Sequence, residues 1–247
     1  MAWRCSGTSN AKLVSNLHDG LHLPGGGHLS EPVVKALNAV DRANYVRDKR
    51  DVNAYDDSPQ TIGYGATISA PHMHAYATEH LREFLRPGMR ALDIGSGSGY
   101  LVAVMHHLVG DTGKVIGIEH IPELVTWSEG NLRQDGLGHA LDSGAIEMVA
   151  GDGREGYAPG ASEYGYVLTG ELGYLGPYEA IHVGAAASKV PQALLDQLAS
   201  PGRMFIPVGS YMQAIEQIDK DEQGRVTRKK VMDVRYVPLT DKEKQYN

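Results

Sequence analysis

A short segment in the first half of the chain combines an acidic residue with three glycines: Asp93-Ile94-Gly95-Ser96-Gly97-Ser98-Gly99. Glycine lets the backbone turn tightly and approach a ligand closely. The dinucleotide pattern G-x-G-x-x-G would need glycine where Tyr100 stands. A carboxylate at Asp93 would repel a pyrophosphate but attract a cation such as the sulfonium or ammonium of S-adenosylmethionine. The segment therefore favours an S-adenosylmethionine site, with a nicotinamide or flavin site as the alternative.

Two further acids follow predicted strands. Glu119 ends the β-branched run 114–118, where a doubly wound sheet places an acid that accepts hydrogen bonds from ribose hydroxyls. Asp152 lies between Gly151 and Gly153 and can accept from an adenine amino group. Taken alone, Glu119 could be a solvated carboxylate at a strand end. Three acids after three successive strands together indicate an adenosine site.

Strand and helix patterns alternate through the rest of the chain. Apolar or β-branched runs predict parallel strands over 90–94, 114–118, 146–150, 180–183 and 204–208. Helical spacing predicts helices over 101–109 and 123–133, and one from Pro191 to about Pro201-Gly202. The last segments, about 214–218 and 231–237, alternate like antiparallel strands.

This alternation predicts an α/β fold with a doubly wound, mostly parallel sheet of Rossmann-like type. N-terminal helices precede the sheet and antiparallel strands end it. Ligands of such sheets bind beyond the carboxyl ends of the strands, at the topological switch point. We expect one domain over 1–247, with 1–70 as an N-terminal helical and active-site segment and 71–247 as the cofactor-binding core. Loops are expected over 23–28, 55–69 and 157–177.

The composition is that of an ordinary globular protein. Hydrophobic residues make up 42% and charged residues 21%, and the formal net charge is −7. The negative charge argues against nucleic acid or an anionic membrane as a partner. The single cysteine, Cys5, excludes an intramolecular disulfide and a cysteine-based zinc site. No leader or membrane-spanning run is recognised. We therefore expect a cytoplasmic protein that acts as a monomer.

Ser69 precedes a predicted helix that begins at Pro71, because proline suits the first helical turn. Ser69 and the N–H groups of His72 and Met73 would then lie at a helix N-terminus, which can bind an anion. The pattern alone fits a capping role for Ser69 better than a catalytic one.

The histidine-rich segments do not indicate a metal site. His18 and His22 are separated by Asp19-Gly20, which breaks a helix. In the pair His106-His107 we expect one exposed ring and one packed ring. His72 could contact substrate, whereas His74 is expected to be structural. The run Arg228-Lys229-Lys230 is expected on a solvated turn and strand edge.

Several motifs resemble the protein-L-isoaspartate O-methyltransferase family and occur in family order over roughly residues 3 to 245. They are the segments 41–46, 57–63, 66–73, 91–100, 151–153, 181–186 and 237–240. The run Thr67-Ile68-Ser69-Ala70-Pro71-His72 is specific to that family, unlike the glycine loop.

The resemblance implies that Ser69 is the active-site serine. It implies that the substrates are isoaspartyl proteins and peptides. It also implies that the methyl donor is S-adenosyl-L-methionine, which leaves as S-adenosyl-L-homocysteine. It implies substrate contacts at Ser69, His72 and Val208. It implies cofactor contacts at Ile62, Gly63, Tyr64, Gly65, Ser69, Asp93, Gly95, Ser96, Gly97, Glu119, His120, Asp152, Gly153 and Thr240.

Two glycine-rich segments, about 161–176 and near Gly25, depart from the family pattern and look like insertions. The first follows the strand before Asp152 and bears on the shape of the substrate groove. A carboxylate nucleophile is ionised near neutrality, so no general base is expected. The alternatives are a methyltransferase of a small molecule and a non-catalytic module that binds an adenosyl ligand.

Overall fold

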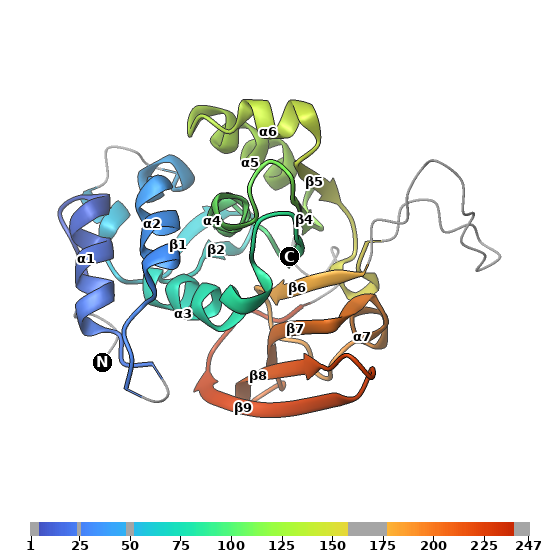
Figure 1. The fold of residues 1–247 in the computed structure, drawn as a ribbon. Coiled ribbons are helices and arrows are strands. Elements are labelled where there is room, and N and C mark those ends of the chain that lie inside the picture. Colours follow the sequence, from blue (N-terminus) through green and yellow to red (C-terminus); the bar gives the residue numbers. More distant parts are fainter. Residues whose placement is uncertain (1–4, 24–25, 48–51, 158–176, 240–247) are drawn as a thin grey trace.

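A seven-stranded sheet forms the centre of the molecule (Figure 1). The computed structural model describes residues 5–23, 26–47, 52–157 and 177–239. The strand order is β5-β4-β3-β6-β7-β8-β9, parallel from β5 to β7 and antiparallel from β7 to β9. Thus the prediction of a mostly parallel sheet with antiparallel C-terminal strands is confirmed. The strands are β3 (Arg90–Ile94), β4 (Lys114–Glu119), β5 (Ile146–Ala150), β6 (Tyr178–Val183), β7 (Leu198–Val208), β8 (Gln213–Lys220) and β9 (Val226–Val234).

Seven α-helices and several short 3-10 helices are found within the described residues. The α-helices are α1 (Asn10–Gly20), α2 (Glu31–Ala39), α3 (Pro71–Leu81), α4 (Tyr100–Val109), α5 (Pro122–Gln134), α6 (Gly138–Ser143) and α7 (Gln192–Gln197). The 3-10 helices are η2 (Arg42–Tyr45), η3 (Val52–Tyr55), η4 (Arg82–Phe84) and η5 (Gly153–Glu155).

Each strand of the central sheet sends alternate side chains to opposite faces. On β3, Ala91 belongs to one buried cluster and Leu92 to the other; on β4, Val115 and Ile116 divide in the same way. The first cluster is covered by α1 to α6 and the second by α7 with neighbouring loops. Both faces are therefore covered, but unequally.

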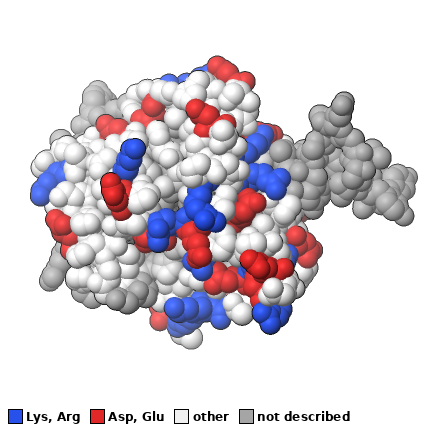
Figure 2. Space-filling model, viewed as in Figure 1, with Lys and Arg blue, Asp and Glu red and all other residues white. Residues whose placement is uncertain are grey.

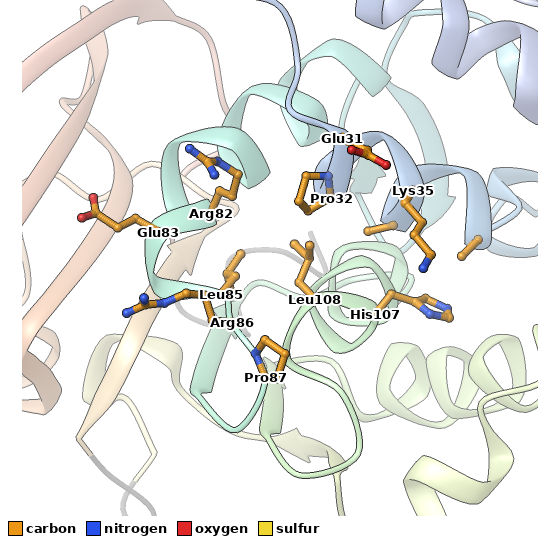
Figure 3. A pocket seen from close by; sticks show the side chains of 12 residues that line it. Glu31, Pro32, Lys35, Arg82, Glu83, Leu85, Arg86, Pro87, His107 and Leu108 are labelled. Atoms are coloured by element: carbon orange, nitrogen blue, oxygen red, sulfur yellow. The ribbon is translucent and has the colours of Figure 1, made fainter.

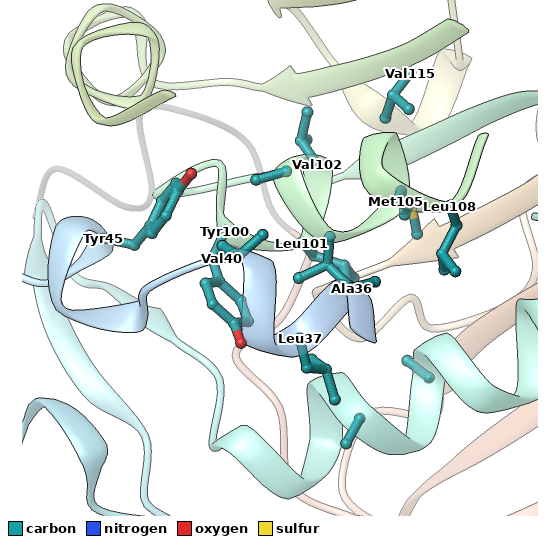
Figure 4. Close-up of a cluster of buried hydrophobic side chains, with 14 of the residues drawn as sticks. Ala36, Leu37, Val40, Tyr45, Tyr100, Leu101, Val102, Met105, Leu108 and Val115 are labelled. Carbon is teal, nitrogen blue, oxygen red and sulfur yellow. The ribbon is translucent and has the colours of Figure 1, made fainter. Parts of the chain in front are cut away.

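The helix α2 packs across α4 in the larger cluster (Figure 4). Ala36 and Val40 lie on the side of α2 that faces Leu101 of α4, Met105 follows one turn further along α4, and Leu37 points toward α3. All five side chains are buried. This contact fixes the N-terminal helices to the helix that begins at the glycine loop.

The segment 55–69, expected to be a loop, contains a short hairpin. Strands β1 (Gln60–Gly63) and β2 (Ala66–Ile68) pair antiparallel, with Thr61 opposite Thr67. Gly63, Tyr64 and Gly65 have φ of 90°, 54° and 68°. These left-handed conformations make the tight turn, and the two glycines adopt them without steric cost.

The predicted helix from Pro191 to Pro201 is wrong in its second half. Helix α7 ends at Gln197, and β7 begins at Leu198, which pairs with Tyr178 of β6. Between Leu198 and Arg203 the strand is irregular, since Ala180 pairs next with Arg203. Sheet pairing overrides the helical spacing of the leucines here.

The last strand lies further towards the N-terminus than expected, at Val226–Val234 instead of 231–237. It is the edge of the sheet, and Arg228, Lys229 and Lys230 on it are exposed, as predicted. The predicted loops at 23–28 and 157–177 fall partly or mostly outside the described residues, as does the segment 161–176.

On the face in Figure 2, acidic and basic side chains are interspersed over the surface. As for the membrane, none of the helices in the described ranges combines the length and the apolar character needed to cross a bilayer.

The contact between α4 and β4 depends on Gly117. A Cβ at this position would lie 2.7 Å from Met148 Cε and 2.9 Å from Val102 Cγ2. We expect Gly117→Ala to lower the free energy of unfolding by about 1–3 kcal/mol, the usual cost of overpacking. Gly130→Ala is the control, because Gly130 is exposed on α5 and an added Cβ there meets nothing within 4 Å. It should raise the free energy of unfolding by about 0.4–1 kcal/mol. Urea unfolding of both variants tests this, and equal effects would contradict it.

Candidate active site

The glycine loop between β3 and α4 is anchored to the end of β4. The backbone N–H groups of Gly95 and Ser96 both donate to the Ile118 carbonyl, at 2.8 and 3.0 Å. Gly97 has φ of 50°, and a Cβ there would lie 3.1 Å from Ile62 Cδ1. The loop thus lies closely between β4 and the β1–β2 hairpin. The buried Ser96 hydroxyl has no hydrogen-bond partner and faces a possible ligand position in this loop.

Glu119 at the end of β4 is nearly fully buried and held by backbone N–H groups. Its carboxylate accepts from Gly97 and from Ile121, each at 3.1 Å. Burial raises the pKa of Glu119, and hydrogen bonds from the backbone oppose that shift. A carboxylate has four lone-pair positions, so these two bonds and a third from the His120 backbone N–H leave it able to accept from a ribose hydroxyl.

Asp93 at the end of β3 is buried and paired with a histidine of the next strand. The His182 Nδ1 atom lies 2.7 Å from Asp93 Oδ1, and the two residues are register partners between β3 and β6. These strands meet at the switch point of the sheet, where the chain turns to opposite sides. Asp93 therefore already has a hydrogen-bond partner within the folded chain.

Asp152 follows β5 and is bound by Arg154. The Arg154 guanidinium donates to both carboxylate oxygens at 2.5 to 3.0 Å. Next to it, Gly153 approaches β3 so closely that a Cβ would lie 2.2 Å from Ile94 Cγ2. The loop after β5 is thus pressed against the end of β3, and an adenine that uses Asp152 must share it with Arg154.

The ends of these strands border two adjoining pockets, which we call the cofactor cleft. Residues common to both are Thr67, Gly95, Gly97 and Gly184. The first pocket is also lined by Glu119, His120, Asp152 and Gly153, and the second by Ser69, Asp93 and Ser96. The predicted cofactor residues Ile62, Gly63, Tyr64 and Gly65 are not in the lining of the cleft, although Ile62 packs against Gly97 of the loop.

One wall of the cofactor cleft is the segment Val237 to Leu239 after β9. Two 2.8 Å hydrogen bonds hold it to Ala186, one from the Ala186 N–H to Val237 and one from Leu239 to the Ala186 carbonyl. The cleft has only about 60 and 30 Å³ in its two parts, less than ligand pockets usually offer. Thr240 lies outside the described residues.

The helix N-terminus near Ser69 is not an open anion site. Ala70 is the N-cap, the His72 N–H donates to Asp57 Oδ1 at 2.9 Å, and the His72 ring lies 2.7 Å from the same oxygen. Met73 N–H donates to the Ala70 carbonyl. The prediction that a substrate carboxylate would use these N–H groups is therefore wrong, because the protein's own Asp57 already occupies that position.

Ser69 instead lies between the cofactor cleft and a larger pocket of about 450 Å³. This second cavity, the substrate pocket, contains His72 together with the C-terminal segment Met232 to Val237. A side-chain hydrogen bond also links Ser69 to Tyr236, whose pKa is raised to about 12 by burial. Val208 lies away from it, paired with Ala214 and bridged to Ala187.

The sequence-based reasoning missed a buried arginine behind Ser69. Arg42 is fully buried and donates to the backbone carbonyls of Ser69 and Ala54 at 2.9 and 3.1 Å. Burial and the nearby Arg42 charge lower the pKa of His74 well below its usual value, so that ring is neutral. Asp57, Arg154 and His182 were missed as well. Asp57 and His182 stood inside family-like motifs, but no local pattern shows which residues they contact.

A further pocket of about 750 Å³ lies away from this site, between α2, η4 and the end of α4 (Figure 3). Arg86, Lys35 and His107 rim it, and Leu85, Pro87 and Leu108 form its floor. None of the three acids that follow the strands lines this pocket, so its size does not make it the candidate active site.

The glycine loop, the acid after β4 and their place at the switch point define the class of protein. This is an S-adenosylmethionine-dependent methyltransferase fold, and the unpartnered Ser96 hydroxyl, the glycine cradle and Glu119 fit such a ligand.

Comparison with known proteins identifies the family. A family model described as protein-L-isoaspartate(D-aspartate) O-methyltransferase (PCMT) matches residues 9–244. Protein-L-isoaspartate O-methyltransferase 1 of Arabidopsis thaliana is 45% identical over 96% of this chain and 93% of its own. The protein-L-isoaspartate O-methyltransferase of Caenorhabditis elegans is 44% identical over 100% of this chain and 99% of its own.

Solved structures agree with this. A putative protein-L-isoaspartate O-methyltransferase from Plasmodium falciparum, in complex with S-adenosyl-L-homocysteine, has a TM-score of 0.79 at 31% identity and covers 95% of this chain and 99% of its own. The chain belongs to the protein-L-isoaspartate(D-aspartate) O-methyltransferase family.

The raised pKa of Glu119 leads to a prediction for cofactor affinity. Only the ionised carboxylate has all its lone pairs available to ribose hydroxyls, so affinity should fall as the pH drops through a pKa above the ordinary 4.5. Calorimetry with S-adenosylhomocysteine between about pH 4.5 and 7 tests this. Glu119→Gln keeps an acceptor but does not titrate, so it should bind more weakly and lose most of this pH dependence. A profile identical to that of the wild type would contradict the role of Glu119.

Proposed function

We propose that this chain methylates the free α-carboxylate of isoaspartyl residues in damaged proteins and peptides, using the residues of the cofactor cleft and the substrate pocket. One observation carries the proposal: Ser69 borders both cavities, so the two reactants would meet beside it. Family membership supports the substrate class.

When bound, S-adenosylmethionine supplies an electrophilic methyl group on its sulfonium. The acceptor is a carboxylate with a pKa near 4, already ionised at neutral pH, so no general base is required. The residues of the site therefore act by alignment and by exclusion of water. This agrees with a site that carries paired acids rather than a free nucleophile.

The cofactor side of the site is proposed as follows. Glu119 accepts from the ribose, Asp152 accepts from the adenine while Arg154 orients it, and Gly95 and Gly97 allow the backbone to approach. His120 and Gly153 line the adenosine end. The buried Ser96 hydroxyl and the Asp93–His182 pair lie at the end nearest Ser69. Their position supports contact with the amino-acid part of the ligand.

On the substrate side, Ser69 donates its hydroxyl to the acceptor carboxylate. Arg42 holds the Ser69 backbone carbonyl from the buried side, which fixes the position of that hydroxyl. His72 lines the same pocket, with its ring kept in place by Asp57. The second carboxylate oxygen of Asp57 is buried without a partner and borders the pocket, where a peptide N–H could reach it.

We also infer that the protein acts in the cytoplasm as a monomer, without nucleic acid or membrane as partner. The net charge of −7 and the single, buried Cys5 support this. Light scattering with size exclusion at micromolar concentration should give the mass of one chain, and a dimer mass would contradict the inference.

Substrate choice gives a sharp test. In an isoaspartyl residue the free carboxylate is on the α-carbon, so relative to aspartate the nucleophile is displaced by about an ångström or more. Such a displacement from an in-line approach can cost about 10²-fold in rate. We expect rapid methylation of an isoaspartyl peptide and at least about 10²-fold slower methylation of its aspartyl twin. Comparable rates on both would exclude the isoaspartyl assignment, and transfer to neither would favour a binding module.

Ser69→Ala tests the role of the serine. The loss of one hydrogen bond to a charged group costs about 1.5–3 kcal/mol, which corresponds to roughly 10- to 10²-fold in rate. Cofactor affinity should change little, because Glu119 and the glycine loop are untouched. Thr67→Ser is a matched control, since it changes a neighbouring hydroxyl residue that lines both cavities. A full rate for Ser69→Ala would remove Ser69 from the mechanism.

A further inference from the structure

Three side chains that take no part in methyl transfer converge at the far end of α4. His106 lies in the last turn of α4, Asp111 lies in the loop before β4, and His139 lies in the first turn of α6. The glycine loop is at the other end of α4, which has ten residues and is therefore about 15 Å long. Within the described ranges this is the one group of three such side chains whose ligand atoms all lie within 4.8 Å of one another.

The distances in this cluster are longer than those of short charge-assisted hydrogen bonds. The Asp111 Oδ1 atom lies 3.3 Å from His106 Nε2 and 3.4 Å from His139 Nε2. Charge-assisted hydrogen bonds are shorter, at about 2.7–2.9 Å. A tetrahedral Zn²⁺ with bonds of about 2.0–2.1 Å separates its ligand atoms by roughly 3.3–3.4 Å. The two separations between Asp111 and the histidines match this spacing, and the ligand atoms of the two histidines lie within 4.8 Å of each other.

The orientation of the His139 ring gives a second observation. Its Nδ1 atom lies 3.3 Å from the Gly136 carbonyl oxygen, which can only accept a hydrogen bond. The Nε2 atom of the same ring faces the Asp111 carboxylate at 3.4 Å. A ring that donates to a backbone carbonyl through one nitrogen and presents the other is the usual form of a metal-bound histidine.

Burial divides the cluster into one fixed ligand and two accessible ones. His106 is 4% exposed, so packing holds its ring in place, and its Nε2 points toward Asp111. The side chains of Asp111 and His139 are 71% and 61% exposed. Water can therefore enter and complete the coordination of an ion at this surface.

We propose that His106, Asp111 and His139 form a binding site for a divalent transition metal of the zinc type, remote from the cofactor cleft. Two imidazoles and one carboxylate suit Zn²⁺, whereas Mg²⁺ and Ca²⁺ require six or more oxygen ligands. The bound ion joins the end of α4 and the following loop to α6. Since only the folded chain brings these three ligands together, the ion stabilises the fold.

Titration calorimetry on the untagged, metal-free full chain tests the proposal, with Zn²⁺ as the probe. We expect one ion per chain and no comparable heat with Mg²⁺. At a free Zn²⁺ concentration about 100 times Kd, the melting temperature should rise by roughly 5–10 °C. The proposal would be overturned if Zn²⁺ gave no binding heat, or if it bound without raising the melting temperature.

Asp111→Asn and His139→Gln change exposed positions and should each weaken Zn²⁺ binding by at least about tenfold. His107→Gln is the matched control, because His107 is the exposed neighbour of His106 and lies outside the cluster. It should leave the affinity unchanged. Neither ligand variant should alter the isoaspartyl methylation rate, and the retained rate shows that the variants are folded. Equal losses in all three variants, or losses in none, would show that the cluster is not the site.

Discussion

A single buried cation, Arg42, holds the active-site half of the molecule together. Its guanidinium is fully buried and is surrounded by the carbonyls of Ala54, Ser58 and Ser69 and by the ring of His74. Burial lowers the pKa of Arg42 to about 10, so the group is still charged at neutral pH. A buried charge is tolerated only where acceptors surround it. Arg42 therefore links its own 3-10 helix to the segment from Ala54 to Ser58 and to the segment from Ser69 to His74.

The same principle applies to the carboxylates of the site. Each acid that follows a strand is first satisfied by the protein: Glu119 by backbone N–H groups, Asp93 by His182 and Asp152 by Arg154. Such partners fix the orientation of the oxygens before a ligand arrives, which is the condition for electrostatic preorganisation. Asp57 shows the limit of this arrangement, because its first oxygen occupies the helix N-terminus and its second has no partner.

The sheet could be predicted from sequence because its strands are buried on both faces and read as short apolar runs between glycine-rich turns. The acids could be placed because parallel strands bring their carboxyl ends to one edge. Two features could not be predicted. The Thr61–Thr67 pairing is made by short, polar strands whose sequence resembles a loop. Leu198 belongs to β7 rather than to the preceding helix because it pairs with Tyr178 of β6, which is distant in sequence. Partners such as Arg42 and His182 depend on contacts between distant segments, which no local pattern records.

The outer edge of the sheet has a consequence for a protein that handles damaged chains. In the described part of the molecule β9 pairs on one side only, and its other side presents backbone groups that an extended polypeptide could join. Arg228, Lys229 and Lys230 lie along this strand and are exposed. A strand that paired with β9 would have to remove water from these charged side chains. If that strand were a second copy of β9, like charges would also be brought together. The edge strand can thus remain unpaired without promoting aggregation.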